Sequence, residues 1–327
     1  MKAFITGIAG FAGSHLAEYL LENTDLEVYG LIHQRSENIA HLREKLTLAS
    51  GDARDLIFLA EILAKIRPDY IFHLAAQSSV HSSWQNPWET FENNVRSQLS
   101  ILQTAVDLGL EPRILVVGSN EEYGFISPED LPLKEDSPLR PISPYGVSKV
   151  AQDFLGLQYY LGYGVHTVRV RPFNHIGPRQ SERFVASAFA RQIAEIEFGL
   201  KPPVLKVGNL ESKRDFTDVR DVVRAYYLAL KHGEPGEVYN IGSGVPRGVR
   251  EILSLLLSMS EMEISIKQDP ACLRPSDVPI SYCDPTKLRQ QTGWKPLIPL
   301  EDSLRDTLKY WREKIKAVDG RRETGNT

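Results

Sequence analysis

Three residues in the middle of the chain have the types and spacing needed to move a proton to or from an oxygen. Tyr145 and Lys149 fall in a predicted helix, Tyr145–Tyr160, one turn apart on the same face. A phenol has an ordinary pKa of about 10, and a neighbouring ammonium group lowers it by favouring the phenolate. Ser119 ends a predicted parallel strand, Arg113–Ser119, at the edge where such sheets bind ligands. We therefore expect Ser119, Tyr145 and Lys149 to form an acid–base site.

A glycine-rich segment near the N-terminus has the spacing GxxGxxG. Gly7, Gly10 and Gly13 lie between a predicted strand, Lys2–Thr6, and a predicted helix, Gly13–Leu21. A dinucleotide pyrophosphate would lie there, against the helix N-terminus. Gly7 permits the tight turn, Gly10 lets phosphates approach the backbone, and Gly13 lets the helix pack closely on the strand. The segment predicts a dinucleotide site, with a plain flexible turn as the alternative.

The end of the second predicted strand, Glu27–Ile32, bears on which dinucleotide would bind. NAD-selective sites place an acidic residue there to bind the ribose diol, but this strand is followed by His33, Gln34 and Arg35. Arg35 could instead hold a 2′-phosphate, which favours NADP(H) over NAD(H), or it could be a solvated surface residue. Asp52, which precedes Ala53, could lie near the adenine or belong to an ordinary turn.

The elements that must position these residues follow a βαβ rhythm. Short apolar runs alternate with amphipathic segments, which predicts an α/β fold, a Rossmann-type doubly wound parallel sheet with a smaller mixed C-terminal lobe. The remaining predicted elements of the first lobe are Tyr70–Ala75, His166–Arg171, Leu56–Ile66 and Thr90–Leu108. We expect the sheet lobe to span residues 1–172, with 216–242 returning to it, the second lobe to span 173–215 and 243–317, and residues 318–327 to form a flexible tail.

Composition and charge exclude several classes of protein. Apolar residues make up 42% of the 327 residues and charged residues 24%, which is typical of a globular chain. The formal net charge of 38 − 42 = −4 argues against a nucleic-acid partner. Cys272 and Cys283 do not have the spacing of a redox pair or a zinc site, and we expect no metal. We also expect no membrane span and a cytoplasmic location, because long apolar runs and a cleavable leader are lacking.

Together, the glycine segment, Ser119, Tyr145 and Lys149 resemble the extended short-chain dehydrogenase/reductase family, in its nucleotide-sugar branch. The resemblance covers essentially the whole chain. It implies that Tyr145 is the acid–base, that Lys149 also bonds the nicotinamide ribose, and that Ser119 bonds the reacting oxygen. The strings 118–124, 140–145, 173–178, 207–211, 214–221 and 273–276 are similar to those of reductases of GDP-4-keto-6-deoxy-D-mannose. The implied product is GDP-6-deoxy-D-mannose, also called GDP-D-rhamnose.

The resemblance, with the positions argued above, also assigns binding residues. The predicted cofactor-binding residues are Gly7, Ala9, Gly10, Phe11, Ala12, Gly13, Arg35, Asp52, Ala53, Leu74, Ala75, Ala76, Tyr145, Lys149, Pro172 and Asn174. The predicted substrate-binding residues are Gln77, Ser79, Ser119, Asn120, Glu121, Tyr145, Asn174, Arg179, Lys206, Arg214, Arg274 and Asp277. The arginines are proposed for the diphosphate, because a planar guanidinium suits it, although a solvent-facing role is the alternative for Arg179.

Two departures leave alternatives open. Asn120 stands where the resemblance leads us to expect Ser, which could alter one substrate hydrogen bond. Glu121 stands two residues after Ser119, where the related GDP-mannose 4,6-dehydratases carry a Glu that could remove the C5 proton. The alternative function is therefore a dehydratase with tightly bound NADP and Glu121 as base. A non-catalytic sensor of NADP and a nucleotide sugar is a further alternative, disfavoured by the complete Ser-Tyr-Lys set.

The long predicted helices also suggest an oligomer. Thr90–Leu108 and Tyr145–Tyr160 could form an intersubunit bundle, or could simply cover the sheet of a monomer. The resemblance implies a homodimer.

Overall fold

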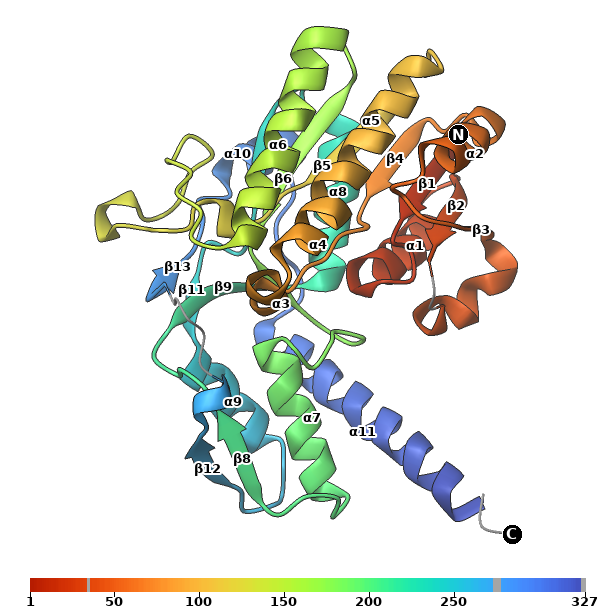
Figure 1. Cartoon of the computed structure of the whole chain (residues 1–327). Coiled ribbons are helices and arrows are strands. Elements are labelled where there is room, and N and C mark those ends of the chain that lie inside the picture. The colour runs from red at the N-terminus through yellow and green to blue at the C-terminus, as the bar shows by residue number, and fades with distance from the viewer. Residues whose placement is uncertain (34–35, 273–277, 325–327) are drawn as a thin grey trace.

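The first lobe is a seven-stranded parallel sheet covered by helices on both faces (Figure 1). The structure, a computed structural model, describes residues 1–33, 36–272 and 278–324, with side chains described to residue 317. The strand order is β10-β6-β5-β4-β1-β2-β3. The strands are β1 (Lys2–Thr6), β2 (Glu27–Ile32), β3 (Thr47–Ser50), β4 (Tyr70–His73), β5 (Arg113–Val117), β6 (Thr167–Pro172) and β10 (Val238–Ile241). This confirms the predicted Rossmann-type doubly wound sheet.

Alternation along β1 explains why the sheet needs helices on both faces. Ala3 and Ile5 pack into one apolar cluster with α1 (Phe11–Asn23) and α8 (Val219–His232), whereas Phe4 packs into another on the opposite face. The helices on that second face are α2 (Leu56–Ile66), α5 (Ser97–Asp107) and α6 (Pro144–Tyr163). Both faces of β1 are thus buried, as parallel sheets require.

The predicted helix over residues 90–108 is longer and less regular in the structure. It begins at Pro87, whose missing N–H and fixed φ suit the first turn, and runs through α4 (Pro87–Phe91), a π-helical turn (Glu92–Arg96) and α5. A short helix, α3 (Val80–Gln85), precedes it. The π-turn matters for the site described below, because it carries the buried Asn94.

The second lobe lies against the carboxyl ends of the sheet strands (Figure 1). Its strands are β7 (Asn174–Ile176), β8 (Val204–Val207), β9 (Lys213–Asp218), β11 (Pro246–Gly248), β12 (Ser265–Gln268) and β13 (Ile280–Ser281). In its main sheet β9 lies between β11 and β13, and β7 also pairs with β9. Its helices are α7 (Val185–Glu197), α9 (Val249–Ser258) and α11 (Leu300–Thr324), which enclose a separate apolar core. Short 3-10 turns occur at Glu37–Lys45, Asn120–Glu122, Pro128–Asp130 and Pro270–Cys272.

One segment departs from the expected division into lobes. Residues 243–317 were expected in the second lobe, but α10 (Thr286–Thr292) packs on α8 and β10 of the first. Leu288 and Trp294 are buried in the core of the first lobe. The Trp294 indole N–H donates to the carbonyl of Asp221 over 2.9 Å, which holds the segment on α8. The chain therefore returns to the first lobe once more than the sequence predicted, which adds two crossings between the lobes.

Candidate active site

Ser119 lies two residues beyond the end of β5, which is two residues shorter than predicted. It is the N-cap of the 3-10 turn Asn120–Glu122, and its Oγ accepts a hydrogen bond from the Glu121 N–H over 3.2 Å. The backbone N–H of Ser119 donates to the Glu122 carboxyl over 2.7 Å. This reciprocal capping box fixes the backbone of Ser119 and so the direction of its hydroxyl.

Tyr145 and Lys149 lie on the first turns of α6 and are both buried. Ser143 caps this helix by accepting from the Gly146 N–H, and Pro144 occupies its first position. The Lys149 Nζ lies 5.8 Å from the centre of the Tyr145 ring and donates to the Val117 carbonyl over 2.9 Å. The structure therefore brings Tyr145 and Lys149 together beside the end of β5.

The acidity of Tyr145 differs from the sequence prediction. Burial raises the pKa of the Tyr145 phenol above its ordinary value, a hydrogen bond with Ser119 opposes that shift, and nearby Glu121 and Glu122 add to it. Burial also lowers the pKa of Lys149, from 10.5 to about 8, so Lys149 loses its charge before the phenol would ionise. The prediction that the ammonium lowers the phenol pKa was wrong because it ignored desolvation. At neutral pH Tyr145 holds its proton, the form needed to donate one.

A buried ionic cluster supports the site from behind. Glu122 is fully buried, and its second carboxyl oxygen lies 2.9 Å from Nε of Arg171. Arg171 also bridges to Asp153, which pairs with Arg169 over 2.7 Å. Burial and the Asp153 carboxylate raise the pKa of Glu122, and Arg171 opposes them. A Cβ at Gly118 would lie only 2.1 Å from the Glu122 oxygen, so the strand end must be glycine for this carboxyl to fit.

Asn94, in the π-turn, connects two loops of the site and was missed by the sequence analysis. Its side chain accepts from the Gln77 N–H over 2.8 Å and donates to the Ser148 hydroxyl over 2.9 Å. Ser148 in turn donates to the carbonyl of Tyr145 over 2.7 Å. No local pattern marked Asn94, because its burial and its partners, 17 and 54 residues away in the chain, are set by packing.

The glycine-rich loop fits a dinucleotide pyrophosphate. Gly7 has φ +68°, and a Cβ there would meet the backbone of Ala75 at 2.9 Å. A Cβ at Gly13 would lie 2.2 Å from the Gly7 carbonyl oxygen. Gly10 caps α1 without any side-chain hydrogen bond, so the first amides of α1 are available to an anion. The residues present therefore match the predicted cofactor, with Ala9, Phe11 and Ala12 on the same turn.

The adenosine end of this predicted site is described only in part. Arg35 lies outside the described residues, so its proposed role with the 2′-phosphate stays a prediction. Asp52 is engaged by Arg54, whose guanidinium donates to both carboxyl oxygens at 2.6 to 3.0 Å. This pairing lowers the pKa of Asp52 and keeps it ionised. Ala53 is buried beside it.

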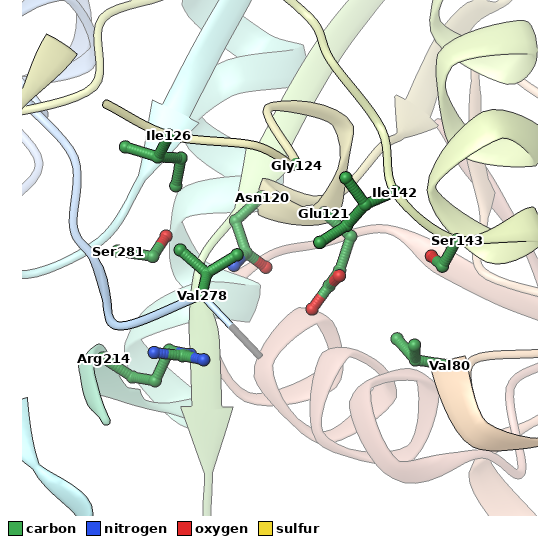
Figure 2. A pocket seen from close by; sticks show the side chains of 10 residues that line it. All are labelled: Val80, Asn120, Glu121, Gly124, Ile126, Ile142, Ser143, Arg214, Val278 and Ser281. Carbon is green, nitrogen blue, oxygen red and sulfur yellow. The ribbon is translucent and has the colours of Figure 1, made fainter. Parts of the chain in front are cut away.

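A pocket opens between the two lobes, next to Ser119 (Figure 2). Three predicted substrate residues, Asn120, Glu121 and Arg214, line it together. Its other lining residues are Val80, Gly124, Ile126, Ile142, Ser143, Val278 and Ser281. Asn120 and Glu121 come from the turn after β5, whereas Arg214 comes from β9, so both lobes contribute polar groups to one cavity.

Among the predicted substrate residues that do not line this pocket, two basic side chains form ion pairs elsewhere. The Arg179 guanidinium is held by Glu18 and His15 of α1, with Nη1 and Nη2 at 2.7 and 2.5 Å from the Glu18 carboxyl oxygens. Lys206, on β8, forms an ion pair with Asp269 over 3.0 Å and is mostly exposed. Their positions give the proposed contacts with the diphosphate no support, because each cation is already paired with a carboxylate of its own chain.

The other predicted residues lie near the ends of β4 and β6 or at the start of β7. Gln77 donates to Thr90, and Ser79 caps α3 by accepting from the Ser82 N–H. Leu74, Ala75 and Ala76 follow β4 beside the glycine loop, while Pro172 ends β6. Asn174 begins β7, and its buried side-chain oxygen has no hydrogen-bond partner among the described residues. Arg274 and Asp277 lie outside the described residues.

A match to a family model decides the family. The model described as GDP-mannose 4,6 dehydratase matches residues 4–307. The chain belongs to this family. It is 35% identical to GDP-6-deoxy-D-mannose reductase of Pseudomonas aeruginosa over 316 residues, 96% of this chain and 98% of that protein. It is also 30% identical to GDP-mannose 4,6-dehydratase of Vibrio cholerae, over 91% of this chain and 90% of the relative.

Solved structures agree with this placement in the GDP-mannose 4,6-dehydratase family. RMD from Pseudomonas aeruginosa complexed with NADPH has a TM-score of 0.85 and 34% identity, covering 96% of this chain and 99% of that one. UDP-glucose 4-epimerase from Thermotoga maritima with UDP-glucose also has a TM-score of 0.85, at 30% identity, covering 96% and 100%. This chain thus shares its fold with both a reductase and an epimerase of nucleotide sugars.

Two features of the described residues bear on other classes of function. Among residues 1–33, 36–272 and 278–324, no His, Cys, Asp and Glu side chains gather in a group of three that could hold a metal ion. In the same residues, no helix has the length and apolar character to cross a membrane.

Proposed function

We propose that this protein reduces the C4 ketone of GDP-4-keto-6-deoxy-D-mannose to give GDP-6-deoxy-D-mannose (GDP-D-rhamnose). The observation that carries the proposal is the match to GDP-6-deoxy-D-mannose reductase over 98% of that protein's length. The buried Ser119, Tyr145 and Lys149 set supports it, because a binding protein has no need of a proton donor held beside a cation. An NAD(P)H-dependent oxidoreductase is therefore favoured over a sensor.

Tyr145 supplies the proton in this mechanism. Its phenol is protonated at neutral pH because burial raises its pKa, and it donates that proton to O4 of the sugar as the ketone is reduced. Ser119 donates a hydrogen bond to the same oxygen, and its capping box holds it ready. The Lys149 ammonium stabilises the phenolate that Tyr145 becomes. Tyr145 is then reprotonated from solvent.

The cofactor is NADP(H) in this proposal, with NAD(H) as the less favoured dinucleotide. The structural neighbour RMD is complexed with NADPH, and other neighbours contain NAD. Gly7, Gly10 and Gly13 would hold the pyrophosphate, and Lys149 and Tyr145 would hold the nicotinamide ribose. When bound, the reduced nicotinamide supplies the hydride to C4.

The pocket of Figure 2 is the proposed site of the sugar diphosphate. Arg214 is the side chain we propose for the diphosphate, with Arg274 and Asp277 as further proposed contacts, and Asn120 and Glu121 face the sugar. Asn174, Gln77 and Ser79 remain proposals for the sugar end. A guanidinium pairs well with phosphate oxygens, so its place on the second lobe supports a nucleotide crossing between the lobes.

One observation favours a second candidate function, the dehydration of GDP-mannose. Glu121 lines the same pocket as Arg214, so a carboxylate is available close to the proposed sugar site. As a base Glu121 would remove the C5 proton while the C6 hydroxyl leaves as water, and tightly bound NADP would be the acceptor and donor of the hydride. The 30% identity to GDP-mannose 4,6-dehydratase is lower than the 35% identity to the reductase, which makes this the weaker candidate.

The test follows the absorbance of NADPH after purified protein is mixed with GDP-4-keto-6-deoxy-D-mannose. A parallel sample contains GDP-mannose without reduced cofactor. We expect NADPH to be consumed with the keto sugar. We expect this consumption to be abolished in Tyr145→Phe, a variant that retains Glu121. Formation of a keto sugar from GDP-mannose, lost in Glu121→Gln, would instead assign the dehydratase reaction. NADH in place of NADPH measures the cofactor preference.

We also propose a homodimer formed through a helix bundle. On α6, Val147, Phe154 and Leu161 are spaced seven residues apart, and their side chains are 42%, 52% and 72% exposed. Such a row is an apolar stripe along one face of a helix, and α5, which packs against α6, also carries an exposed Leu99. A second copy would cover it by pairing the same face. Light scattering should give twice the chain mass, and Leu161→Glu should give a monomer.

The proposed location is the cytoplasm. Cys272 and Cys283 are both free thiols in the structure, and Cys283 is buried. Free thiols suit a reducing compartment. Microscopy of a fluorescent fusion, or cell fractionation, tests this directly.

A further inference from the structure

The main sheet of the second lobe places three polar side chains on one face. Arg214 and Phe216 are two residues apart on β9, so their side chains point to the same face of the sheet. Ser281 of β13 is aligned with Arg214, and Asn174 of β7 is aligned with Phe216, in parallel pairs. Aligned residues of neighbouring strands share a face, so Ser281, Arg214 and Asn174 face the same way. Thr217, between Phe216 and Asp218, faces the other way.

Ser281 is buried without satisfying its hydroxyl. Its side chain is 3% exposed, and its Oγ has no hydrogen-bond partner among the residues that the structure describes. A buried hydroxyl without a partner costs free energy, so such a group in a folded protein calls for an explanation. No local pattern pointed to Ser281, because it lies in a stretch of mixed polar and apolar residues between Val278 and Cys283.

The position of this hydroxyl supplies the explanation. Ser281 lines the pocket shared with Asn120, Glu121 and Arg214, and in Figure 2 its hydroxyl oxygen is directed to the side on which Asn120 lies. Its aligned neighbour on the sheet is the guanidinium-bearing Arg214. A hydroxyl donor and a guanidinium that line one pocket from neighbouring strands are suited to an anionic ligand that reaches both.

We infer that Ser281 is a substrate-binding residue whose hydroxyl donates a hydrogen bond to a diphosphate oxygen of the nucleotide sugar, beside Arg214. The inference rests on the proposed function for the identity of the nucleotide. The ligand removes the cost of the unpaired hydroxyl when it binds, which links nucleotide affinity to this side chain. Neither the sugar ring nor the acid–base group is involved, so binding rather than turnover depends on Ser281.

Thr217 offers a matched control. Its Oγ1 is also buried without a hydrogen-bond partner among the described residues, and it lies on the adjacent strand of the same sheet. It faces away from Arg214, however, and does not line the pocket. Thr217→Val therefore removes a buried unpaired hydroxyl of the same kind without touching the proposed diphosphate site.

The experiment compares wild type, Ser281→Ala and Thr217→Val in three measurements. Calorimetry gives the Kd of GDP, NADPH absorbance gives kcat and KM for GDP-4-keto-6-deoxy-D-mannose, and thermal unfolding gives the Tm without ligand. For Ser281→Ala we expect about a 10-fold rise in the Kd of GDP and in KM, the loss of one hydrogen bond to a charged group, with kcat within about 2-fold of wild type. Its ligand-free Tm should not fall, because the hydroxyl it loses was unpaired. Thr217→Val should leave all values near wild type.

The outcomes separate this inference from the proposed function. An unchanged Kd for GDP in Ser281→Ala overturns the contact with the diphosphate, even if KM rises, because the lost contact would then be to the sugar. A Tm several degrees lower without ligand would show a structural role instead. If wild type binds GDP but does not reduce the keto sugar, the proposed function is wrong. The Kd values for GDP then still test whether Ser281 contacts the diphosphate. If wild type does not bind GDP, both are overturned.

Discussion

The alkaline limb of the pH–rate profile should belong to Lys149 rather than to Tyr145. Burial lowers the pKa of Lys149 to about 8, whereas burial raises the pKa of Tyr145 above its ordinary value. As pH rises, the ammonium is therefore lost first while the phenol keeps its proton. We expect kcat to be constant at neutral pH and to fall with an apparent pKa of about 8.

The size of the fall follows from the geometry. The ammonium lies 5.8 Å from the centre of the phenol ring, and two unit charges at that distance interact by about 3 kcal/mol at an effective dielectric constant of about 20. This is the stabilisation that the phenolate loses when Lys149 is neutral, and it corresponds to about 100-fold in rate. Lys149→Met should therefore lower kcat about 100-fold at pH 7 and remove the limb at pH 8.

The assay is NADPH oxidation at saturating substrate from pH 6 to 10, for wild type, Lys149→Arg and Lys149→Met. Lys149→Arg keeps its charge and should move the limb upward, since a guanidinium stays protonated. Loss of activity at high pH can be distinguished from unfolding, because the pKa of Lys149 in the folded protein lies below its ordinary value of 10.5. Between pH 8 and 10.5, Lys149 is protonated to a greater extent in the unfolded chain than in the folded protein. Its contribution to the free energy of unfolding therefore rises with pH, while activity falls. The reasoning is refuted if Lys149→Met retains the limb near pH 8 or loses less than about 3-fold in kcat at pH 7.

Three further predictions test other parts of the structure. Tyr145→Phe should lower kcat by about 10²- to 10⁴-fold, whereas the NADPH Kd in a fluorescence titration should rise by about 10-fold or less, the loss of one hydrogen bond; retention of a tenth of the rate would remove Tyr145 as the acid. Gly13→Ala should abolish NADPH binding in the same titration, because its Cβ would lie 2.2 Å from the Gly7 carbonyl oxygen; wild-type affinity would contradict the tight loop. Burial lowers the pKa of His73 from 6.5 to about 3. As pH falls from 6.5 to 3, His73 is therefore protonated in the unfolded chain before it is protonated in the folded protein. The free energy of unfolding should then fall by about 1.4 kcal/mol per pH unit below pH 6.5. Chemical denaturation of His73→Gln should show a weaker dependence of this free energy on pH, and an unchanged dependence would show that another group is responsible.

The sequence by itself determined the features that depend on short spacings. The GxxGxxG segment between a strand and a helix, and the one-turn separation of Tyr145 and Lys149, are set by local backbone periodicity. The strand–helix alternation predicted the sheet for the same reason. The ends of the elements were less predictable. β4 and β5 each end two residues before the predicted position, because tight turns follow them and the pairing between strands stops there.

Only the tertiary structure decided which neighbouring residues serve which role. Glu121 and Glu122 are adjacent in the sequence, yet Glu121 lines the pocket while Glu122 is buried against Arg171. Arg179 is paired with Glu18, and Ser281 is placed beside Arg214 by the pairing of β13 with β9. Pairings across such long stretches of chain, and the desolvation that raises the pKa of Tyr145, arise only when distant segments pack together, so no local pattern encodes them.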